Sequence, residues 1–265
     1  MPAGLRTREV LGVLREVRSA AASVAPIVVL GLLAEELARG LRAGASDGRA
    51  VIAGGDPTRG AALVVVVAGA PGVAEERALR EATRRGIPVV AVQTDTRTPV
   101  SLPYVLATDV VECPPGHGFP IPEIAAALAG LLGHEGVSLS RRLPVLRDAV
   151  CRALIGSASR QAALVGLVPW SKRPHLPVLA LIQTRLVLDL AAAHGRAIDR
   201  DCAPHVAAVS GASVGLRSLA RRLPASIPFV GGLTGYFGTR AIGEAALKRL
   251  TLDSGAASES VRFRT

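Results

Sequence analysis

Long uninterrupted hydrophobic runs are absent from this sequence of 265 residues. Its longest stretches without a charged residue, Ser19–Ala34 and Leu223–Thr239, have 16 and 17 residues, and both contain proline or glycine. A membrane-spanning helix needs about 20 apolar residues. The N-terminus also lacks the pattern of a secretory signal, because charged residues are spread through it. We therefore expect a cytoplasmic protein.

Aromatic residues make up only 3% of the chain, which disfavours the stacking platforms that bind single-stranded nucleic acid. Only three cysteines occur, Cys113, Cys151 and Cys202, and their spacing fits neither a disulfide framework nor a metal site. We predict that they are small buried hydrophobic side chains. The five histidines show no ligand spacing either. No metal and no cofactor is therefore predicted.

The residues that are present favour a folded chain with an unequal distribution of charge. Hydrophobic residues make up 49%, and the mean hydropathy is +0.39. Up to Glu135 there are 13 arginines and 14 acidic residues, a net charge of −1, whereas from Gly136 onward 18 basic and 7 acidic residues give +11. A basic, oily half with few aromatic residues points to an anionic membrane surface before it points to nucleic acid.

Changes in periodicity divide the chain into four parts. Residues 1–25 are predicted to form an amphipathic helix with an arginine-rich polar face. Residues 26–135 alternate short β-branched runs with helical stretches, residues 136–253 are predicted to be helical throughout, and residues 254–265 are predicted to form a flexible tail.

The first large part has the pattern of a parallel sheet. The continuous apolar run Leu63–Val67 is typical of a strand buried on both faces. We predict an α/β fold with an open, mostly parallel sheet and helices on both sides, followed by an all-α domain. Strands are expected at 27–30, 50–53, 63–68, 88–93 and 105–112, with helices at 32–43, 73–85 and 121–132. In the second half, helices are expected at 143–165, 177–194, 204–223 and 229–250.

Ligands of parallel α/β sheets bind at the carboxyl ends of the strands, so a phosphate-binding loop would lie in the connection after Leu30. Such a loop needs glycines, a lysine and a serine or threonine. The sequence here, Gly31 to Leu37, has one glycine, no lysine and no hydroxyl, and it carries Glu35 and Glu36 where phosphates would lie. We therefore expect no intact phosphate-binding loop and predict no catalytic residue.

The stretch from Leu63 to Asp95, a strand, Ala70-Pro71-Gly72, a helix and a second strand, resembles the matching part of Era-like GTPase domains. The resemblance implies a degenerate, GTPase-like domain in which Asp95 corresponds to the guanine-reading aspartate. The alternative is that Asp95 caps a turn beside Thr94. Cys113 and His117 flank a rigid Pro-Pro-Gly segment, but without a third partner they are weak candidates for nucleophilic catalysis.

Small residues and one charge pair mark the helices of the second half. Arg185 and Asp189 stand four residues apart, which allows them to pair on one helix face. The glycines at positions 211, 215, 231 and 235 are spaced for backbone-to-backbone packing of helices, which is common in membrane-associated hairpins. The residues predicted to serve helix packing are therefore Arg185, Asp189, Gly211, Gly215, Gly231 and Gly235.

Basic side chains stand at the edges of these oily stretches. The candidates for contact with a membrane or a partner are Arg217, Arg221, Arg222, Arg240, Lys248 and Arg249. Charged residues within the helices argue against deep insertion, whereas a position at the interface is less costly.

Residues 145–250 are similar to the YcjF-type domain of unknown function that accompanies bacterial Era-like GTPase domains. The residues that carry this resemblance are Pro177, Gln183, Arg185, His194, Gly195, Arg196, Asp199, Arg200, Gly211, Leu216, Arg217, Ile227, Pro228, Gly232, Gly238, Thr239, Arg240 and Gly243. The resemblance implies a helical, membrane-associated module next to a GTPase-like domain.

The leading hypothesis is a non-catalytic adaptor or regulatory protein at the inner face of the membrane, which combines a pseudo-GTPase domain with a basic helical module. Its expected partners are an anionic membrane surface or a membrane protein, with a GTPase or a second copy of the chain as further candidates. One alternative is a switch protein that binds GTP or ATP through an atypical loop. Others are a soluble helical-bundle interaction protein and, less favoured by composition, a nucleic-acid binder.

Overall fold

The computed structural model describes residues 25–95, 102–114, 116–167, 176–196 and 230–262. The described residues form two compact units that meet in sequence between Ala153 and Leu154. We call the part before this boundary the sheet unit and the part after it the helical unit. The sequence predicted the change of domain at residue 135, so the sheet unit extends 18 residues beyond the predicted boundary.

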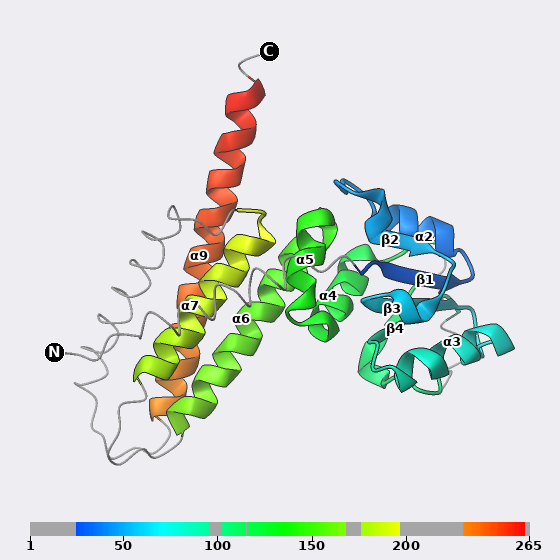
Figure 1. Ribbon diagram of the computed structural model, residues 1–265, viewed down its shortest axis with the longest axis horizontal. Coiled ribbons are helices and arrows are strands. Elements are labelled where there is room, and N and C mark those ends of the chain that lie inside the picture. Colours follow the sequence, from blue (N-terminus) through cyan, green and yellow to red (C-terminus); the bar gives the residue numbers. More distant parts are fainter. Residues whose placement is uncertain (1–24, 96–101, 115, 168–175, 197–229, 263–265) are drawn as a thin grey trace. The chain divides into compact units, whose positions relative to one another are not determined.

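The sheet unit contains five parallel strands in the order β2-β1-β3-β4-β5 (Figure 1). β3, with the sequence ALVVVV, is buried along its whole length, because it lies inside the sheet and both of its faces are covered. This confirms the predicted α/β fold and the interpretation of the continuous apolar run. The strands are β1 (Ile27–Gly31), β2 (Val51–Ala53), β3 (Ala62–Val67), β4 (Val89–Gln93) and β5 (Val110–Glu112).

Helices cover both faces of the sheet. α3 (Val73–Arg84) packs Leu79 and neighbouring alanines against Leu63 and Val65. α2 (Ala34–Leu41) lies on the opposite side of the sheet from α3 (Figure 1). α4 (Ile121–Leu132) lies beside α2 and packs against β4 and β5. The bounds of α4 are those predicted from the sequence, since its apolar residues recur at helical spacing.

Short 3-10 turns precede three of the strands: η1 (Gly48–Ala50), η2 (Pro57–Arg59) and η3 (Ala107–Asp109). Side chains of Asp47 and Asp56 cap the first two by accepting backbone N–H bonds. The third turn corrects the sequence prediction, which extended a strand from 105 to 112. β5 has only three residues, because the preceding residues turn instead of continuing the ladder.

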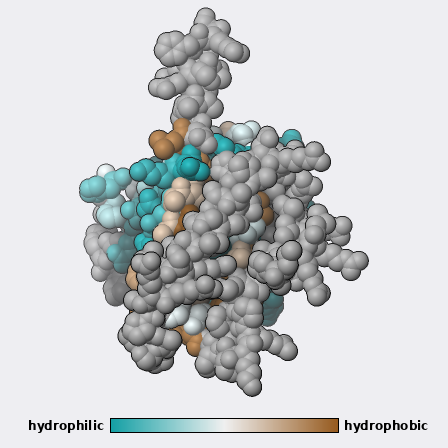
Figure 2. Space-filling model, turned by 90° about the vertical axis from the view of Figure 1, so that its left-hand side faces the viewer, coloured by the Kyte–Doolittle hydropathy of each residue, from teal (hydrophilic) through white to brown (hydrophobic). Residues whose placement is uncertain are grey.

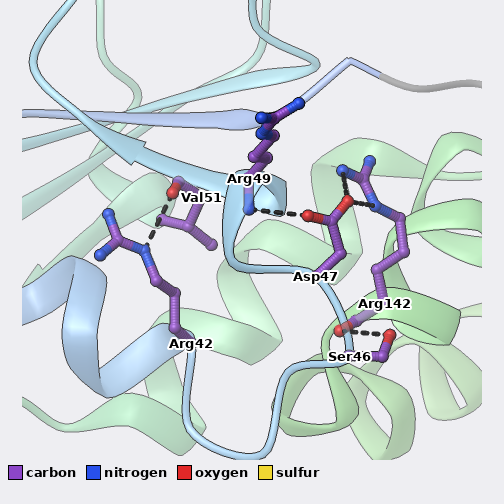
Figure 3. Close-up of polar contacts among 6 residues, drawn as sticks. All are labelled: Arg42, Ser46, Asp47, Arg49, Val51 and Arg142. Carbon is purple, nitrogen blue, oxygen red and sulfur yellow. Dashed lines mark hydrogen bonds and ion pairs between the residues drawn. The ribbon is translucent and has the colours of Figure 1, made fainter.

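The loop after α2 is joined to α5 (Glu135–Arg142), a helix that the sequence did not predict as a separate element. Both the Nε and the Nη2 atoms of Arg142 donate to Asp47 Oδ2, at 3.1 and 2.6 Å (Figure 3). The Ser46 N–H also donates to the Arg142 carbonyl at 3.1 Å. These contacts hold α5 against the sheet unit, which explains why the unit extends beyond residue 135.

Among the described residues, three helices contribute to the helical unit: the second part of α6 (Pro144–Leu167), α7 (Leu176–Ala193) and α9 (Val230–Arg262). α6 and α9 approach so closely that a Cβ on Gly235 would lie 2.5 Å from the Ala162 carbonyl oxygen. A Cβ on Gly166 would likewise collide with the backbone of Gly231. Glycine is therefore required where these two backbones meet.

Two predictions for the ends of the chain have different outcomes. α9 continues to Arg262. The prediction of a flexible tail from residue 254 is therefore wrong for residues 254–262. The amphipathic helix predicted within residues 1–25 and the helix predicted at 204–223 lie outside the described residues.

Candidate functional site

The carboxyl edge of the sheet is the first candidate site. The strand order changes direction between β1 and β3, and ligands of such sheets bind at this point. β1 ends at Gly31, whose φ is +93°. A side chain there would collide with the Val66 carbonyl oxygen, and the Leu32 N–H donates to the same oxygen at 3.1 Å. The turn is therefore held tightly against β3.

The connection from β1 to α2 consists of this short turn alone. α2 begins at Ala34, directly after Leu33, and Glu35 and Glu36 occupy its first turn. Carboxylates at this position interact favourably with the positive end of the helix dipole. They also repel the phosphate groups that a nucleotide would place there.

The connection from β3 to α3 is also negatively charged, because Glu75 and Glu76 lie in the first turn of α3. A Cβ on Gly72 would lie 2.6 Å from Glu75 Oε2, so this carboxylate is turned back to the start of its own helix. Glu76 accepts from Arg80 Nη2 at 2.7 Å. The first turns of both helices that flank the switch point therefore carry acidic side chains.

Asp95 lies at the same edge, two residues after the end of β4. Its carbonyl oxygen accepts a hydrogen bond from Gln93 Nε2 at 2.6 Å. The structure thus places Asp95 on the edge where the predicted guanine contact would stand. Its role in nucleotide binding remains a prediction.

Cys113 follows β5 at this edge, with its Sγ 3.1 Å from the Gly118 carbonyl oxygen. Burial raises the pKa of its thiol, and the Glu36 carboxylate raises that pKa further. Because the thiolate is the nucleophile, both effects oppose a nucleophilic role. Cys151 is buried as well, and burial raises its pKa to about 12. Both side chains fit the predicted role of small buried residues, and Cys202 lies outside the described residues.

The leucines of the β1–α2 turn were not among the residues predicted from the sequence. Leu32 and Leu33 are 54% and 52% exposed. Leu33 has a φ of +56°, in the left-handed region that glycine and asparagine favour. The available signal was the sequence of the turn itself, which contains neither glycine nor asparagine after Gly31. It could not show that these leucines stay outside the core.

The second candidate site lies in the helical unit, where α6 ends and α9 begins. Leu164 and Leu167 on α6 and Leu233 and Phe237 on α9 are exposed. The glycine contacts between the two helices bring these ends together, since a Cβ on Gly232 would lie 2.8 Å from Leu167 Cδ2. Figure 2 shows brown apolar surface at the lower end of this unit, the end at which α9 begins in Figure 1. We call these four side chains the apolar end.

Arginines stand about one helical turn from the apolar end. Arg160 precedes Leu164 by four residues and is exposed. Arg240 follows Phe237 by three, donates to Glu244 Oε1 at 2.8 Å and lies 3.5 Å from the Tyr236 hydroxyl. Both hydrogen bonds raise the pKa of the Arg240 guanidinium, and the bond to Glu244 has the larger effect.

The other predicted contact residues are spread along the chain. Lys248 and Arg249 are exposed on α9, farther from the apolar end than Arg240. Arg217, Arg221 and Arg222 lie outside the described residues.

Residues that were predicted to serve helix packing lie inside the helical unit. Arg185 Nε is 3.9 Å from Asp189 Oδ2, and the aspartate is almost fully buried. Gln183 Nε2 also donates to Thr239 Oγ1 at 3.3 Å, which joins α7 to α9. Gly231 and Gly235 pack against α6 as described above, whereas Gly211 and Gly215 lie outside the described residues.

Within the described ranges, no three His, Cys, Asp or Glu side chains are grouped as a metal site would require. No helix in the part of the chain that the structure describes combines the length and hydropathy needed to cross a bilayer. The chain matches no family model, and neither a curated protein nor a solved structure is significantly similar to it.

Proposed function

We propose that this protein is a non-catalytic adaptor that binds the surface of an anionic membrane through its helical unit and presents its GTPase-like sheet unit to a partner. The observation that supports the proposal most directly is the apolar end of α6 and α9. Leu164 and Phe237 are 66% and 61% exposed there, although the two helices pack against one another a turn away.

The apolar end has the side-chain chemistry of an interfacial contact. Helices that lie in a membrane interface bury leucine and phenylalanine at the boundary with the acyl chains and keep arginine at the headgroups. Arg160 and Arg240 stand at the edge of the apolar end, where a basic residue near an anionic surface contributes about 1 kcal/mol of attraction. The pattern fits attachment to a surface.

The charge of the helical unit acts in the same direction. The described residues of this unit, 154–167, 176–196 and 230–262, contain seven basic and four acidic residues. Two of the four acids are paired, because Asp189 is buried beside Arg185 and Glu244 is bonded to Arg240. The net charge is therefore positive, which attracts anionic lipids over a distance of about one Debye length.

Liposome flotation of the full-length protein tests the proposal. We expect flotation with vesicles rich in anionic lipid, little with neutral vesicles, and release as salt screens the basic side chains. The double substitution Leu233→Ser and Phe237→Ser should abolish most of the flotation. Leu106→Ser is the matched control, because Leu106 is 70% exposed but lies in the sheet unit. Arg160→Glu should weaken binding, and Arg39→Glu, an exposed arginine of the sheet unit, should not.

If the wild-type protein stays with the buffer fraction at every lipid composition, the proposal is wrong. The helical unit would then act as a soluble interaction bundle, the alternative that the sequence analysis left open. Equal loss of flotation in the Leu106→Ser control would show that the effect is not specific to the apolar end. The nucleotide-binding switch remains a prediction, and the carboxylates in the first turn of α2 disfavour it.

A further inference from the structure

We propose that the β1–α2 turn of the sheet unit is a docking surface for a basic amphipathic helix of a partner protein. The surface consists of Leu32 and Leu33 together with the carboxylates of Glu35 and Glu36. This inference rests on the adaptor function proposed above, whose partner it describes, but it concerns the unit that is not assigned to the membrane.

The apolar part of the surface is the exposed leucine pair. About half of each side chain remains in contact with solvent. The neighbouring connection, from β3 to α3, also exposes an apolar residue at this edge, Val73. Exposed apolar side chains at the switch point of a parallel sheet are positioned where such folds bind their ligands.

The turn holds the leucines in one conformation. The Leu32 N–H donates to the Val66 carbonyl, and the Leu33 carbonyl accepts from the Leu37 N–H, both at 3.1 Å. A left-handed conformation is unfavourable for a residue such as Leu33. Half of its side chain nevertheless stays outside the core. A fixed, exposed pair loses little conformational entropy when a partner covers it.

The charge around the leucines determines which partner fits. Described residues 31–36, 68–76, 93–95, 112–114 and 116–123, the connections at this edge, contain no lysine or arginine. Glu35 and Glu36 are exposed, and Arg42 Nη1 lies 3.9 Å from Glu35 Oε2. Nucleotides, nucleic acids and anionic lipids are repelled here, whereas arginine and lysine side chains are attracted.

A helix that carries an apolar stripe between basic residues satisfies both parts of the surface. Its stripe would cover Leu32 and Leu33, and its guanidinium groups would donate to the carboxylates of Glu35 and Glu36. The small area of the surface is typical of a weak, reversible interaction.

Two synthetic peptides of about five helical turns test the inference with full-length protein. They share one leucine stripe, and their polar faces carry either arginine or glutamate. We expect the arginine peptide to bind and the glutamate peptide to bind at least about tenfold more weakly in fluorescence anisotropy. The double substitution Leu32→Ser and Leu33→Asn should weaken the binding of the arginine peptide by about tenfold or more. Asparagine tolerates the left-handed conformation, so this variant should keep its fold, which circular dichroism checks.

Matched controls separate the surface from general effects. Leu106→Ser should bind the arginine peptide as the wild-type protein does. Replacing Glu35 and Glu36 by glutamine should weaken binding and reduce its dependence on salt, whereas Glu135→Gln, in the first turn of α5, should not. Absence of arginine-peptide binding, equal binding of the two peptides, or binding that Leu32→Ser and Leu33→Asn do not change would each overturn the inference.

Flotation distinguishes a failure of this inference from a failure of the membrane proposal. The Leu32→Ser and Leu33→Asn variant should float with anionic vesicles as the wild-type protein does, because the substitutions leave the apolar end intact. If this variant also loses flotation, the turn belongs to the membrane contact and the docking surface is refuted.

Discussion

The sheet unit and the helical unit fill their interiors in different ways. Of the eleven largest side chains that are fully buried within the described ranges, ten belong to the sheet unit and one, Leu190, to the helical unit. In the helical unit, glycine brings the backbones of α6 and α9 together, and Gln183, Thr239 and Asp189 are buried. The sheet unit therefore depends on large apolar volume, whereas the helical unit depends on small residues that permit close approach.

This difference teaches which kind of substitution each unit should resist. A core filled by leucine and isoleucine loses stability when atoms are removed and a cavity remains. A contact between two backbones loses stability when atoms are added, since nothing can move aside without separating the helices.

The largest effect is expected for Leu128→Ala in α4. Leu128 is fully buried, so the substitution should lower the free energy of unfolding of the sheet unit by about 3 kcal/mol. Urea unfolding of the full-length protein gives the magnitude, and hydrogen exchange of α4 and the strands locates it. Leu106→Ala, at an exposed position, should change stability by less than about 0.5 kcal/mol. Similar losses from both substitutions would contradict the description of the core.

Smaller changes in stability, of opposite sign, are expected for substitutions at two glycines of the helical unit. Gly235→Ala should destabilise this unit by about 1–3 kcal/mol, because the new methyl would lie 2.5 Å from the Ala162 carbonyl oxygen. Gly156→Ala on α6 meets nothing within 4 Å and should stabilise by about 0.5–1 kcal/mol, since alanine favours the helix. Thermal unfolding followed by circular dichroism compares the two variants. A stabilising Gly235→Ala would show that α6 and α9 do not pack through this glycine.

The smallest effect concerns the amino edge of the sheet unit, which depends on an ion pair as well as on its core. The backbone N–H of Arg49 and then the guanidinium of Arg142 lower the pKa of Asp47 below its ordinary value of 3.8. A carboxyl with a lowered pKa contributes stability above its ordinary value and loses that contribution as the pH falls through the lowered one. The contribution of Asp47 is therefore complete near neutral pH and disappears in acid below about pH 4.

Asp47→Asn should accordingly be less stable than the wild-type protein at neutral pH, and the difference should shrink in acid. Urea midpoints measured between about pH 6 and pH 2 test this. Asp56→Asn is a useful comparison, because the hydroxyl and N–H of Thr58 lower the pKa of that carboxyl without a bond to α5. If only Asp47→Asn increases hydrogen exchange in α5, the bond to Arg142 holds that helix in place.

Several elements were predictable because their signal is local. The bounds predicted for α4 agree with the structure, and the strand at 89–93 differs by one residue. Asp95 lies at the carboxyl edge of the sheet, as its position in the sequence indicated. A residue that closely follows a strand must lie near the end of that strand. The apolar end was not predicted, because the same leucines at helical spacing would be expected of a buried face.

The sequence by itself determined most of the strands and helices in the described parts of both units, with α5, the start of β5 and the end of α9 as exceptions, because apolar periodicity and turn residues act over a few neighbours. Tertiary structure alone decided the strand order and the bond between Asp47 and Arg142, which joins positions 95 residues apart. It also decided that Leu33 and Phe237 stay exposed while Leu128 does not. The physical reason is that burial depends on what lies opposite a side chain in space, and distant parts of the chain supply that surface.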